Sequence, residues 1–419
     1  MGKYTLSSFF AGIGGFDIAF ERNGFETKFL CEINPFCNGI LNDHWPNVQK
    51  HNDIEKVDCN EIPKTDVWTG GFPCQDISVA RGASKRLGLL GSRSGLFYRF
   101  AYLISERKPQ VVIIENVGGL LNSNQGRDFG VILQTMTGLG YAVSWRVLNS
   151  RYFGVPQSRT RVYICCWLKN PRKSLRVMFD KEGAEKQHNE RIDFMTESNA
   201  PGEYPKVPKV AYCLAASSGR HTGTDWSRTY VVCKNGVRRM TPLESERLQG
   251  FPDNWTRPQN MANDIEKINT LRYTAIGNAV SVPVVEWIAK RVYGQLEEVN
   301  TSEDFTLQEV TLIAPELTKA VWNTNLAEMD YSNEETTHKW QKSGFAWGKG
   351  FMERTISPTP SCIIKSKLID LIDKNEVDSS YYISPNAAEG ILRRVNHQGR
   401  KLFAPLNLAL ETLKEINNE

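Results

Sequence analysis

The sequence has no CxxC pair, no long apolar run and little net charge. Its nine cysteines are odd in number, which with the missing CxxC pair argues against a disulfide framework and against a cysteine zinc site. The longest apolar runs, such as Val111–Ile114 and Val162–Leu168, have the length of a strand and are too short to span a bilayer. Gly2–Phe10 leads directly into a folded pattern instead of forming a charged and then apolar signal segment. These absences predict a cytoplasmic protein without a metal site or a membrane contact.

The net charge of +4 is a weak indication of any charged partner, but its distribution along the chain is uneven. Lys169–Arg239 contains 14 Lys and Arg against 8 Asp and Glu, so this segment carries +6 and the rest of the chain carries −2. A basic segment on a neutral protein is typical of a phosphate-binding surface. A solvated surface loop would explain the charge equally well.

A length of 419 residues predicts two or three domains. From Lys3 to Leu168, short apolar runs alternate with helix-like stretches, which predicts a doubly wound α/β sheet. The periodicity weakens from Lys169 to Gly236, and Phe305–Glu419 is an additional segment of mixed character. The predicted strands are Tyr4–Phe9, Lys28–Ile33, Asp66–Thr69, Val111–Glu115 and Arg161–Leu168, and the predicted helices are Phe16–Asn23, Phe36–His44, Leu96–Arg107, Phe129–Leu139 and Pro242–Leu248.

A glycine-rich turn, Phe9-Phe10-Ala11-Gly12-Ile13-Gly14-Gly15, follows the first predicted strand. Glycines there let the backbone turn tightly and approach a ligand, and the N-terminus of the next helix adds favourable amide dipoles. Glu32 ends the second predicted strand, where a carboxylate suits a ribose diol, and Asp53 follows after the next short segment. The pattern indicates a nucleoside-cofactor site, although an ordinary strand, turn and helix would look similar.

Two further motifs place reactive side chains at the ends of strands. In Gly70-Gly71-Phe72-Pro73-Cys74-Gln75, a cysteine follows a strand's C-terminal end, where open α/β sheets bind ligands. Cys74 is therefore a candidate nucleophile, with a small buried apolar residue as the alternative. In Ile114-Glu115-Asn116-Val117, a carboxylate ends a buried strand, and burial makes it a plausible proton donor. The alternative is a carboxylate that caps the next turn.

Gln157-Ser158-Arg159-Thr160-Arg161 precedes the last predicted strand of this region. Strand alternation would place Gln157, Arg159 and Arg161 on one face. Two arginines on one face can hold a base edge or a phosphate. An exposed polar strand edge is the alternative.

Together these motifs resemble those of the DNA (cytosine-5) methyltransferase family of bacterial or phage type. Phe-x-Gly-x-Gly, Pro-Cys-Gln, Glu-Asn-Val and Gln-x-Arg-x-Arg occur in the family's order, and Arg239–Pro252 and Gly277–Pro283 match two later motifs. The resemblance covers about Lys3–Tyr293. It implies a mostly parallel, Rossmann-like methyltransferase sheet, a smaller target-recognition domain and a C-terminal extension. The predicted domains are 1–168 for catalysis, 169–270 for recognition, 271–300 returning to the catalytic domain, and 301–419 of unknown role.

The resemblance also implies S-adenosylmethionine as cofactor. Phe10 would stack on the adenine, Gly12 and Gly14 would lie near the methionine part, and Glu32 would bind the ribose hydroxyls. The cofactor-binding residues that it implies are Phe10, Ala11, Gly12, Gly14, Gly15, Glu32, Ile33, Asp53, Ile54, Pro73, Asn278 and Val280.

The implied catalytic residues are Cys74, Glu115, Arg159 and Arg161. Cys74 would add to carbon 6 of cytosine, Glu115 would hydrogen-bond or protonate N3, and the two arginines would hold the base. The target base must first leave the DNA stack. Asp76–Ser94 carries a net charge of +3 and would close over DNA phosphates, with a disordered basic loop as the alternative. The implied DNA-binding residues are Gln75, Arg81, Lys85, Arg86, Arg220, Arg228 and Arg239.

The predicted partner is double-stranded DNA, and a restriction endonuclease acting on the same site is a candidate second partner of this predicted monomer. Two alternatives are an RNA cytosine-5 methyltransferase and a catalytically silent DNA-binding accessory protein. The separate recognition segment and the Pro-Cys-Gln context favour DNA. The presence of Cys74, Glu115, Arg159 and Arg161 argues against a silent protein.

Within Phe305–Glu419, Tyr381–Pro385 followed by Ala387–Val395 is typical of a capped helix with a basic end, Arg393-Arg394. For the whole of Phe305–Glu419, structural packing and a DNA-contact or partner role both stay open.

Overall fold

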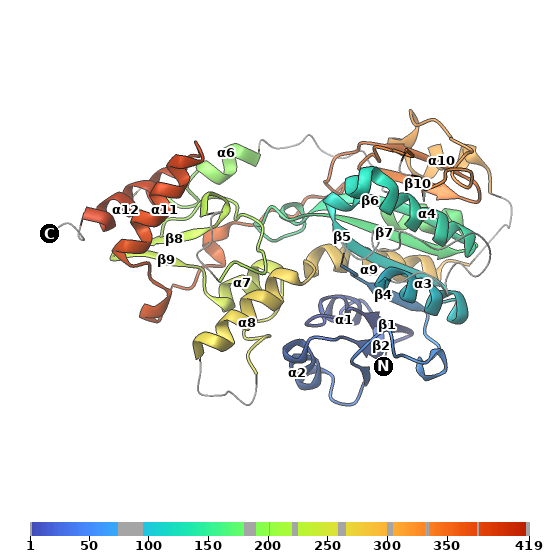
Figure 1. The fold of residues 1–419 in the computed structure, drawn as a ribbon, viewed down its shortest axis with the longest axis horizontal. Helices are drawn as coiled ribbons and strands as arrows, with labels where there is room; N and C mark the ends of the chain where they lie inside the picture. The colour runs from blue at the N-terminus through green and yellow to red at the C-terminus, as the bar shows by residue number, and fades with distance from the viewer. Residues whose placement is uncertain are drawn as a thin grey trace. The chain divides into compact units, whose positions relative to one another are not determined.

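The protein is described by a computed structural model, in which the chain forms two compact units (Figure 1). Unit 1 comprises Met1–Leu148, Thr160–Lys186 and Val284–Cys362, and unit 2 comprises Asn149–Arg159, Gln187–Pro283 and Ile363–Glu419. The structure describes residues 2–73, 95–179, 190–200, 202–219, 225–258, 265–299, 305–331, 333, 335–374 and 377–415. No helix in these ranges is long and apolar enough to cross a bilayer.

A nine-stranded sheet with the order β11-β10-β6-β7-β5-β4-β1-β2-β3 forms the centre of unit 1. The pairs β1–β2, β1–β4, β2–β3 and β4–β5 are parallel, whereas β5–β7, β6–β10 and β10–β11 are antiparallel. The predicted α/β class with a mostly parallel, Rossmann-like sheet is confirmed. Its strands are β1 (Tyr4–Phe9), β2 (Phe25–Cys31), β3 (Gln49–His51), β4 (Val67–Gly70), β5 (Val111–Val117), β6 (Tyr141–Asn149), β7 (Thr160–Leu168), β10 (Ser343–Trp347) and β11 (Gly350–Arg354).

A side-chain cap explains where α2 begins, and the backbone conformation explains where α3 ends. At the start of α2, the Asn34 side chain accepts the amide protons of Phe36 and Cys37, which satisfies two unpaired donors of the first turn. α3 ends at Arg107, and the next residue, Lys108, has φ +47° and precedes Pro109. The helices are α1 (Gly15–Glu21), α2 (Pro35–His44), α3 (Leu96–Arg107), α4 (Arg127–Gly138), α5 (Pro171–Met178), α9 (Val282–Glu297, whose first two residues belong to unit 2) and α10 (Leu307–Ile313).

The core of unit 1 gathers aromatic rings from adjacent parallel strands and from α3. The ring of Phe9 lies 4.6 Å from that of Trp68 and 5.1 Å from that of Phe100, measured between centroids. Val111–Ile114 are fully buried, as expected for a strand covered on both faces. This packing fixes the carboxyl ends of β1, β4 and β5, from which the candidate site residues extend.

Two parts of unit 1 differ from the expectation that the regular pattern stops at Lys169. Pro171–Met178 form α5, which packs against the sheet through a 2.9 Å hydrogen bond between the hydroxyls of Ser174 and Ser144. β10 and β11 come from the C-terminal extension and add to the sheet next to β6, with Ser343 opposite Arg146. α5 was not predicted because it is only eight residues long and opens a polar segment, and β10 was not predicted because its pairing with β6 joins residues about half the chain apart.

Unit 2 is built around the two-stranded hairpin of β8 and β9. The capping box of α7 is complete, because Thr241 and Glu244 each accept the other's backbone amide proton. Gly250 then ends α7 in a left-handed conformation with φ +86°. The elements are β8 (Tyr230–Cys233), β9 (Gly236–Arg239), α6 (Glu190–Met195), α7 (Pro242–Gln249), α8 (Ile265–Asn278), α11 (Pro385–His397) and α12 (Ala404–Glu415).

The C-terminal extension is divided between the units. Residues 305–362 belong to unit 1, whereas residues 363–415 belong to unit 2. There α11 and α12 lie beside the hairpin (Figure 1) and share a hydrophobic cluster with it, in which Ile391 and Leu410 are fully buried together with Val237. This part of the extension is therefore integral to unit 2.

Candidate active site

The loop after β1 has a left-handed backbone at three positions. Phe10, Gly12 and Gly14 have φ values of +54°, +57° and +80°. A Cβ on Gly14 would lie 2.3 Å from the ring of Trp45, so both conformation and space require glycine there. A Cβ on Gly12 would meet no heavy atom within 4 Å, so only its conformation selects glycine. The loop thus has open space at Gly12, directly before α1.

Glu32 fixes this loop from the end of β2. Its carboxylate accepts the amide proton of Gly12 at 2.8 Å and that of Asn34 at 2.7 Å. Ala11 is also bound to β2, because its amide donates to the carbonyl of Cys31 at 3.0 Å. The structure therefore brings together Glu32 and the glycine loop, which the sequence treats as parts of one site.

Asp53 lies beyond the end of β3, which runs parallel to β2 with His51 opposite Cys31. Its carboxylate accepts the amide proton of Glu55 at 3.0 Å and pairs with Lys56 at 3.1 Å, and these contacts hold its pKa below the ordinary value. Ile54 is buried, whereas Ile33 is 72% exposed. Carboxylates thus follow the ends of two adjacent parallel strands.

The segment before Cys74 is held to the end of β5. The side-chain amide of Asn116 donates to the backbone carbonyl of Phe72 at 2.9 Å, and Phe72 is buried. The centroid of the Phe10 ring lies 6.4 Å from that of the Phe72 ring, so the loop after β1 and this segment are neighbours. Pro73 is exposed. The predicted residues Cys74, Gln75, Arg81, Lys85 and Arg86 lie outside the described residues.

Glu115 and Arg161 form an ion pair between the antiparallel strands β5 and β7. Arg161 Nε lies 3.1 Å from Glu115 Oε1, and the two side chains are only 15% and 10% exposed. A Cβ placed on Gly71 would lie 3.8 Å from Glu115 Oε2. A largely buried carboxylate with a guanidinium beside it therefore lies close to the backbone three residues before Cys74.

Gln157 and Arg159 occupy a different environment in unit 2. The guanidinium of Arg159 donates to the carbonyls of Leu214 at 3.0 Å, Gly277 at 3.2 Å and Ala279 at 2.7 Å. The expectation that strand alternation places Gln157, Arg159 and Arg161 on one face does not hold, because β7 begins at Thr160 and the first two residues precede it.

The same region contains Gln249, whose role the sequence did not indicate beside that of Gln157. Gln157 donates to the carbonyl of Leu248 at 3.0 Å and accepts the amide proton of Leu214 at 2.9 Å, while Gln249 donates to the carbonyl of Ile276 at 2.9 Å. These amides connect α7, α8 and the segment before β7. The position of Gln249 within the motif after Thr241 is the only signal that could have indicated this role.

The motif at the end of α8 is shaped by close backbone packing. A Cβ on Gly277 would lie 2.3 Å from the carbonyl carbon of Ala215, so only glycine fits. Asn278, the last residue of α8, is exposed, and Val280 is buried. Both residues belong to unit 2.

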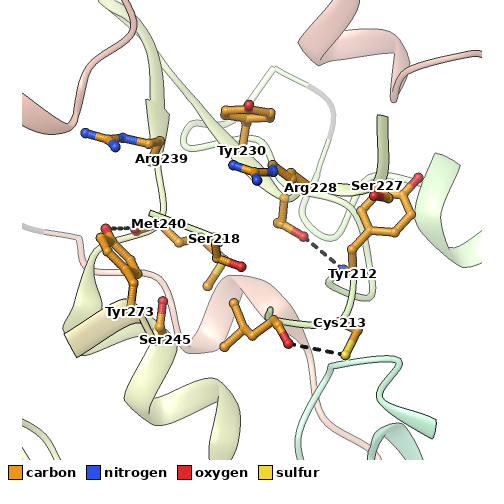
Figure 2. Close-up of a pocket in the computed structure, with 12 residues that line it drawn as sticks. Tyr212, Cys213, Ser218, Ser227, Arg228, Tyr230, Arg239, Met240, Ser245 and Tyr273 are labelled. Carbon is orange, nitrogen blue, oxygen red and sulfur yellow. Dashed lines mark hydrogen bonds between the residues drawn. The ribbon is translucent and has the colours of Figure 1, made fainter. Parts of the chain in front are cut away.

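A pocket in unit 2 brings together two of the predicted DNA-binding residues (Figure 2). Arg228 donates to the carbonyl of Ser217 at 2.9 Å, and Arg239 donates to the carbonyl of Gly219 at 2.6 Å. Arg220 lies outside the described residues. The lining contains no carboxylate and comprises Tyr212, Cys213, Leu214, Ser218, Ser227, Arg228, Thr229, Tyr230, Arg239, Met240, Ser245 and Tyr273.

Asp17 is a buried carboxylate that lies outside the sequence motifs. It lies in the first turn of α1, is fully buried, and accepts a 3.4 Å hydrogen bond from Thr27 Oγ1. Burial raises its pKa to about 7. Among the described residues, no group of three or more His, Cys, Asp or Glu side chains could hold a metal ion.

A mostly parallel α/β sheet with a glycine turn after its first strand and charged side chains at its strand ends has the architecture of proteins that bind a nucleoside cofactor. Comparison with known proteins specifies the family. The family model for C-5 cytosine-specific DNA methylases matches residues 4–210 and 199–294, and the chain belongs to this family. It is a DNA (cytosine-5) methyltransferase, and the resemblance predicted from the motifs is confirmed.

Curated relatives match over most of their length. The chain is 31% identical over 302 residues to the type II methyltransferase M2.BsuMI of Bacillus subtilis (strain 168), covering 68% of this chain and 74% of that protein. It is 32% identical over 324 residues to the type II methyltransferase M1.ScrFI of Lactococcus lactis subsp. cremoris, covering 71% and 79%. It also resembles the crystal structure of the S. pombe Dnmt2 methyltransferase with a TM-score of 0.49 and 20% identity, covering 70% of this chain and 99% of that one.

Proposed function

We propose that the enzyme transfers a methyl group from S-adenosylmethionine to carbon 5 of a cytosine flipped out of duplex DNA, with Cys74 as a covalent nucleophile. The observation that carries this proposal is the Glu115–Arg161 pair, which places a carboxylate beside Gly71, three residues before Cys74. In the family's motif pattern, these residues correspond to the groups that act on the base.

The loop after β1 fits the proposed cofactor. Glu32 is anchored by two backbone amides, and its oxygens can accept further hydrogen bonds, which suits the hydroxyls of a ribose. The open space at Gly12 admits a ligand close to the backbone, and the ring of Phe10 supplies an apolar surface for an adenine. When bound, S-adenosylmethionine supplies an electrophilic methyl group. We propose that Asp53, Ile54, Asn278 and Val280 complete its site.

Cysteine is required because carbon 5 of cytosine is a poor nucleophile. Addition of the Cys74 thiolate to carbon 6 gives carbon 5 the electron density of an enamine. Glu115 would donate a hydrogen bond or a proton to N3, which makes carbon 6 more electrophilic. Arg161 positions the Glu115 carboxylate and, together with Arg159, would hold the activated base. Loss of the proton from carbon 5 then allows Cys74 to leave.

We further propose that unit 2 selects the target sequence. Arg228 and Arg239 line a pocket without carboxylates, and such side chains can contact base edges or phosphates. The relatives M2.BsuMI and M1.ScrFI are type II methyltransferases by name. A restriction endonuclease that acts on the same site is therefore a candidate partner.

Bisulfite sequencing tests the proposal, because methylation of carbon 5 protects cytosine from deamination. Duplex DNA incubated with the enzyme and S-adenosylmethionine should show protected cytosines in one sequence context, and transfer RNA treated in the same way should show none. Protection confined to the RNA would reject duplex DNA as the substrate, and no protection in either would reject the activity.

A further inference from the structure

The end of α11 carries a basic segment that none of the motifs includes. Residues 390–410 contain Arg393, Arg394, Arg400 and Lys401 together with His397, and they contain no Asp or Glu. The net charge of this segment is therefore +4, equal to the net charge of the whole chain.

This basic segment is held on the hairpin of unit 2. The amide of Ile383 donates to the carbonyl of Val237 at 2.9 Å, so the backbone before α11 pairs with β9. Ile391 and Val395 are buried in the cluster that also contains Tyr230 and Val232 of β8. One face of α11 is thus fixed to the hairpin, and its other face is available to solvent.

The basic side chains lie on that solvent-exposed side. Arg393 and His397 are exposed one turn apart on α11, and Arg400 and Lys401 are exposed directly after it. We call these four residues the α11 basic surface. Glu389, one turn before Arg393, is the nearest acidic residue in the sequence.

Two contacts connect α11 and the residue Arg400 after it to the segment from which base recognition is expected. Arg394 Nε donates to the carboxylate of Asp225 at 2.7 Å, and the guanidinium of Arg400 lies 4.4 Å from the centroid of the Trp226 ring. Asp225 is 1% exposed, so the charge of Arg394 is offset by a buried partner, whereas the four residues of the α11 basic surface stay exposed.

We propose that the α11 basic surface binds phosphates of duplex DNA next to the β8–β9 hairpin. Exposed Arg and Lys side chains that outnumber the one neighbouring carboxylate of Glu389 suit a phosphate backbone, which is contacted regardless of sequence. The surface therefore contributes affinity and register, and base selection stays with other residues of unit 2. This inference rests on the proposed function in taking duplex DNA as the substrate.

The test compares two sets of substitutions that change the charge equally. The first is the triple variant Arg393→Gln, Arg400→Gln and Lys401→Gln, and the control is Lys339→Gln, Lys342→Gln and Lys349→Gln, three exposed lysines of unit 1. DNA dissociation constants are measured from low to moderate salt. The first variant should reduce the slope of log affinity against log salt by about 2 to 3 and weaken binding about tenfold or more, while the control keeps the wild-type slope. The first variant should still methylate the same sequence, because phosphate contacts carry no sequence information.

Arg400 packs on Trp226, so its loss could disturb the fold of unit 2. The double variant Arg393→Gln and Lys401→Gln keeps that contact and should still reduce the slope by about 1 to 2. Arg393→Lys with Arg400→Lys keeps the charge and should retain the wild-type slope. A double variant with the slope of the control would overturn the inference. Methylation of the same duplex by the wild-type enzyme tests the proposed function separately, because it does not depend on either variant.

Discussion

Single carboxylates show how each residue's surroundings determine its role. Glu32 is anchored by two backbone amides beside an open loop, Asp17 is enclosed without an ionic partner, and Glu115 is paired with Arg161. The surroundings of Glu32 suit ligand binding, whereas those of Asp17 penalise the charged form of its carboxyl group. The surroundings of Glu115 place a largely buried proton donor or acceptor near the end of β5.

Replacing Glu32 with Ala should weaken S-adenosylmethionine binding by about 1–3 kcal/mol, the usual cost of leaving hydrogen-bonding groups without partners. Calorimetric titration of the cofactor in the absence of DNA measures this. Glu26→Ala is the matched control, because Glu26 lies on the same strand and pairs with Lys28, away from the loop. Equal dissociation constants for the two variants would remove Glu32 from the cofactor site.

Asp17→Asn should change how stability depends on pH. The folded-state pKa of about 7 is above the ordinary value of 3.8, so the folded protein retains a proton that the unfolded chain loses. This contribution to wild-type stability is complete below pH 3.8 and is lost as the pH rises towards 7. The variant's advantage in free energy of unfolding should therefore grow by about 2 kcal/mol from pH 5 to pH 8. Urea unfolding at several pH values measures it, and a difference that does not vary with pH would show that Asp17 does not titrate in this range.

At the residue scale, local motifs indicate the glycine loop and Glu115 because their roles depend on a strand end and the turn after it. The contacts of Arg159 could not be predicted in the same way. They join carbonyls at 214, 277 and 279, which lie 55 to 120 positions further along the chain. No local pattern reports such contacts.

Among the elements, predictions succeeded where periodicity was strong. β1 and α3 have the predicted bounds, Tyr4–Phe9 and Leu96–Arg107. β6 was missed although all nine of its residues are buried, because Ser144, Arg146 and Asn149 interrupt the apolar run that would predict a buried strand. α11 was predicted as a capped helix over Ala387–Val395 and spans Pro385–His397. α12 was not predicted, because its apolar face is covered by the β8–β9 hairpin, a partner distant in sequence.

The dependence of the hairpin on α12 can be measured with two leucines of that helix. Leu410 is fully buried in the shared cluster, whereas Leu408 is 70% exposed. Leu410→Ala should lower the free energy of unfolding by about 2–5 kcal/mol, and Leu408→Ala should change it by no more than about 0.5 kcal/mol. Hydrogen exchange should locate the loss of protection in β8 and β9. Equal effects of the two substitutions would show that α12 does not support the hairpin.

At the scale of the whole molecule, the boundary of the recognition segment can be stated more closely than from the sequence. α5 packs on the sheet of unit 1 through Ser174, and Arg146 of β6 donates to the carbonyl of Met178 at 3.1 Å. We therefore propose that the segment that selects the DNA sequence begins after α5 and includes residues 190–239.

Exchange of residues 190–239 for the matching segment of a related enzyme should change which sequence is methylated but not which atom. The candidate catalytic residues all lie outside this range, and Arg228 and Arg239 lie within it. A chimera exchanged from residue 169 also replaces α5 and should lose stability in unit 1. Bisulfite sequencing gives the methylated context of each chimera. An unchanged context in a folded 190–239 chimera would place recognition elsewhere in the chain.

A trapping experiment can show whether Cys74 attacks the base. Duplex DNA with 5-fluorocytosine at the target position lacks the proton that must leave carbon 5, so the covalent adduct persists after methyl transfer. With S-adenosylmethionine present, the wild type and Cys362→Ser, which changes an exposed cysteine of unit 1, should form a DNA complex that resists denaturation. Cys74→Ser should form none, because a serine hydroxyl is far less nucleophilic than a thiolate. A stable complex with Cys74→Ser, or none with the wild type on DNA that contains its methylated sequence, would contradict the account.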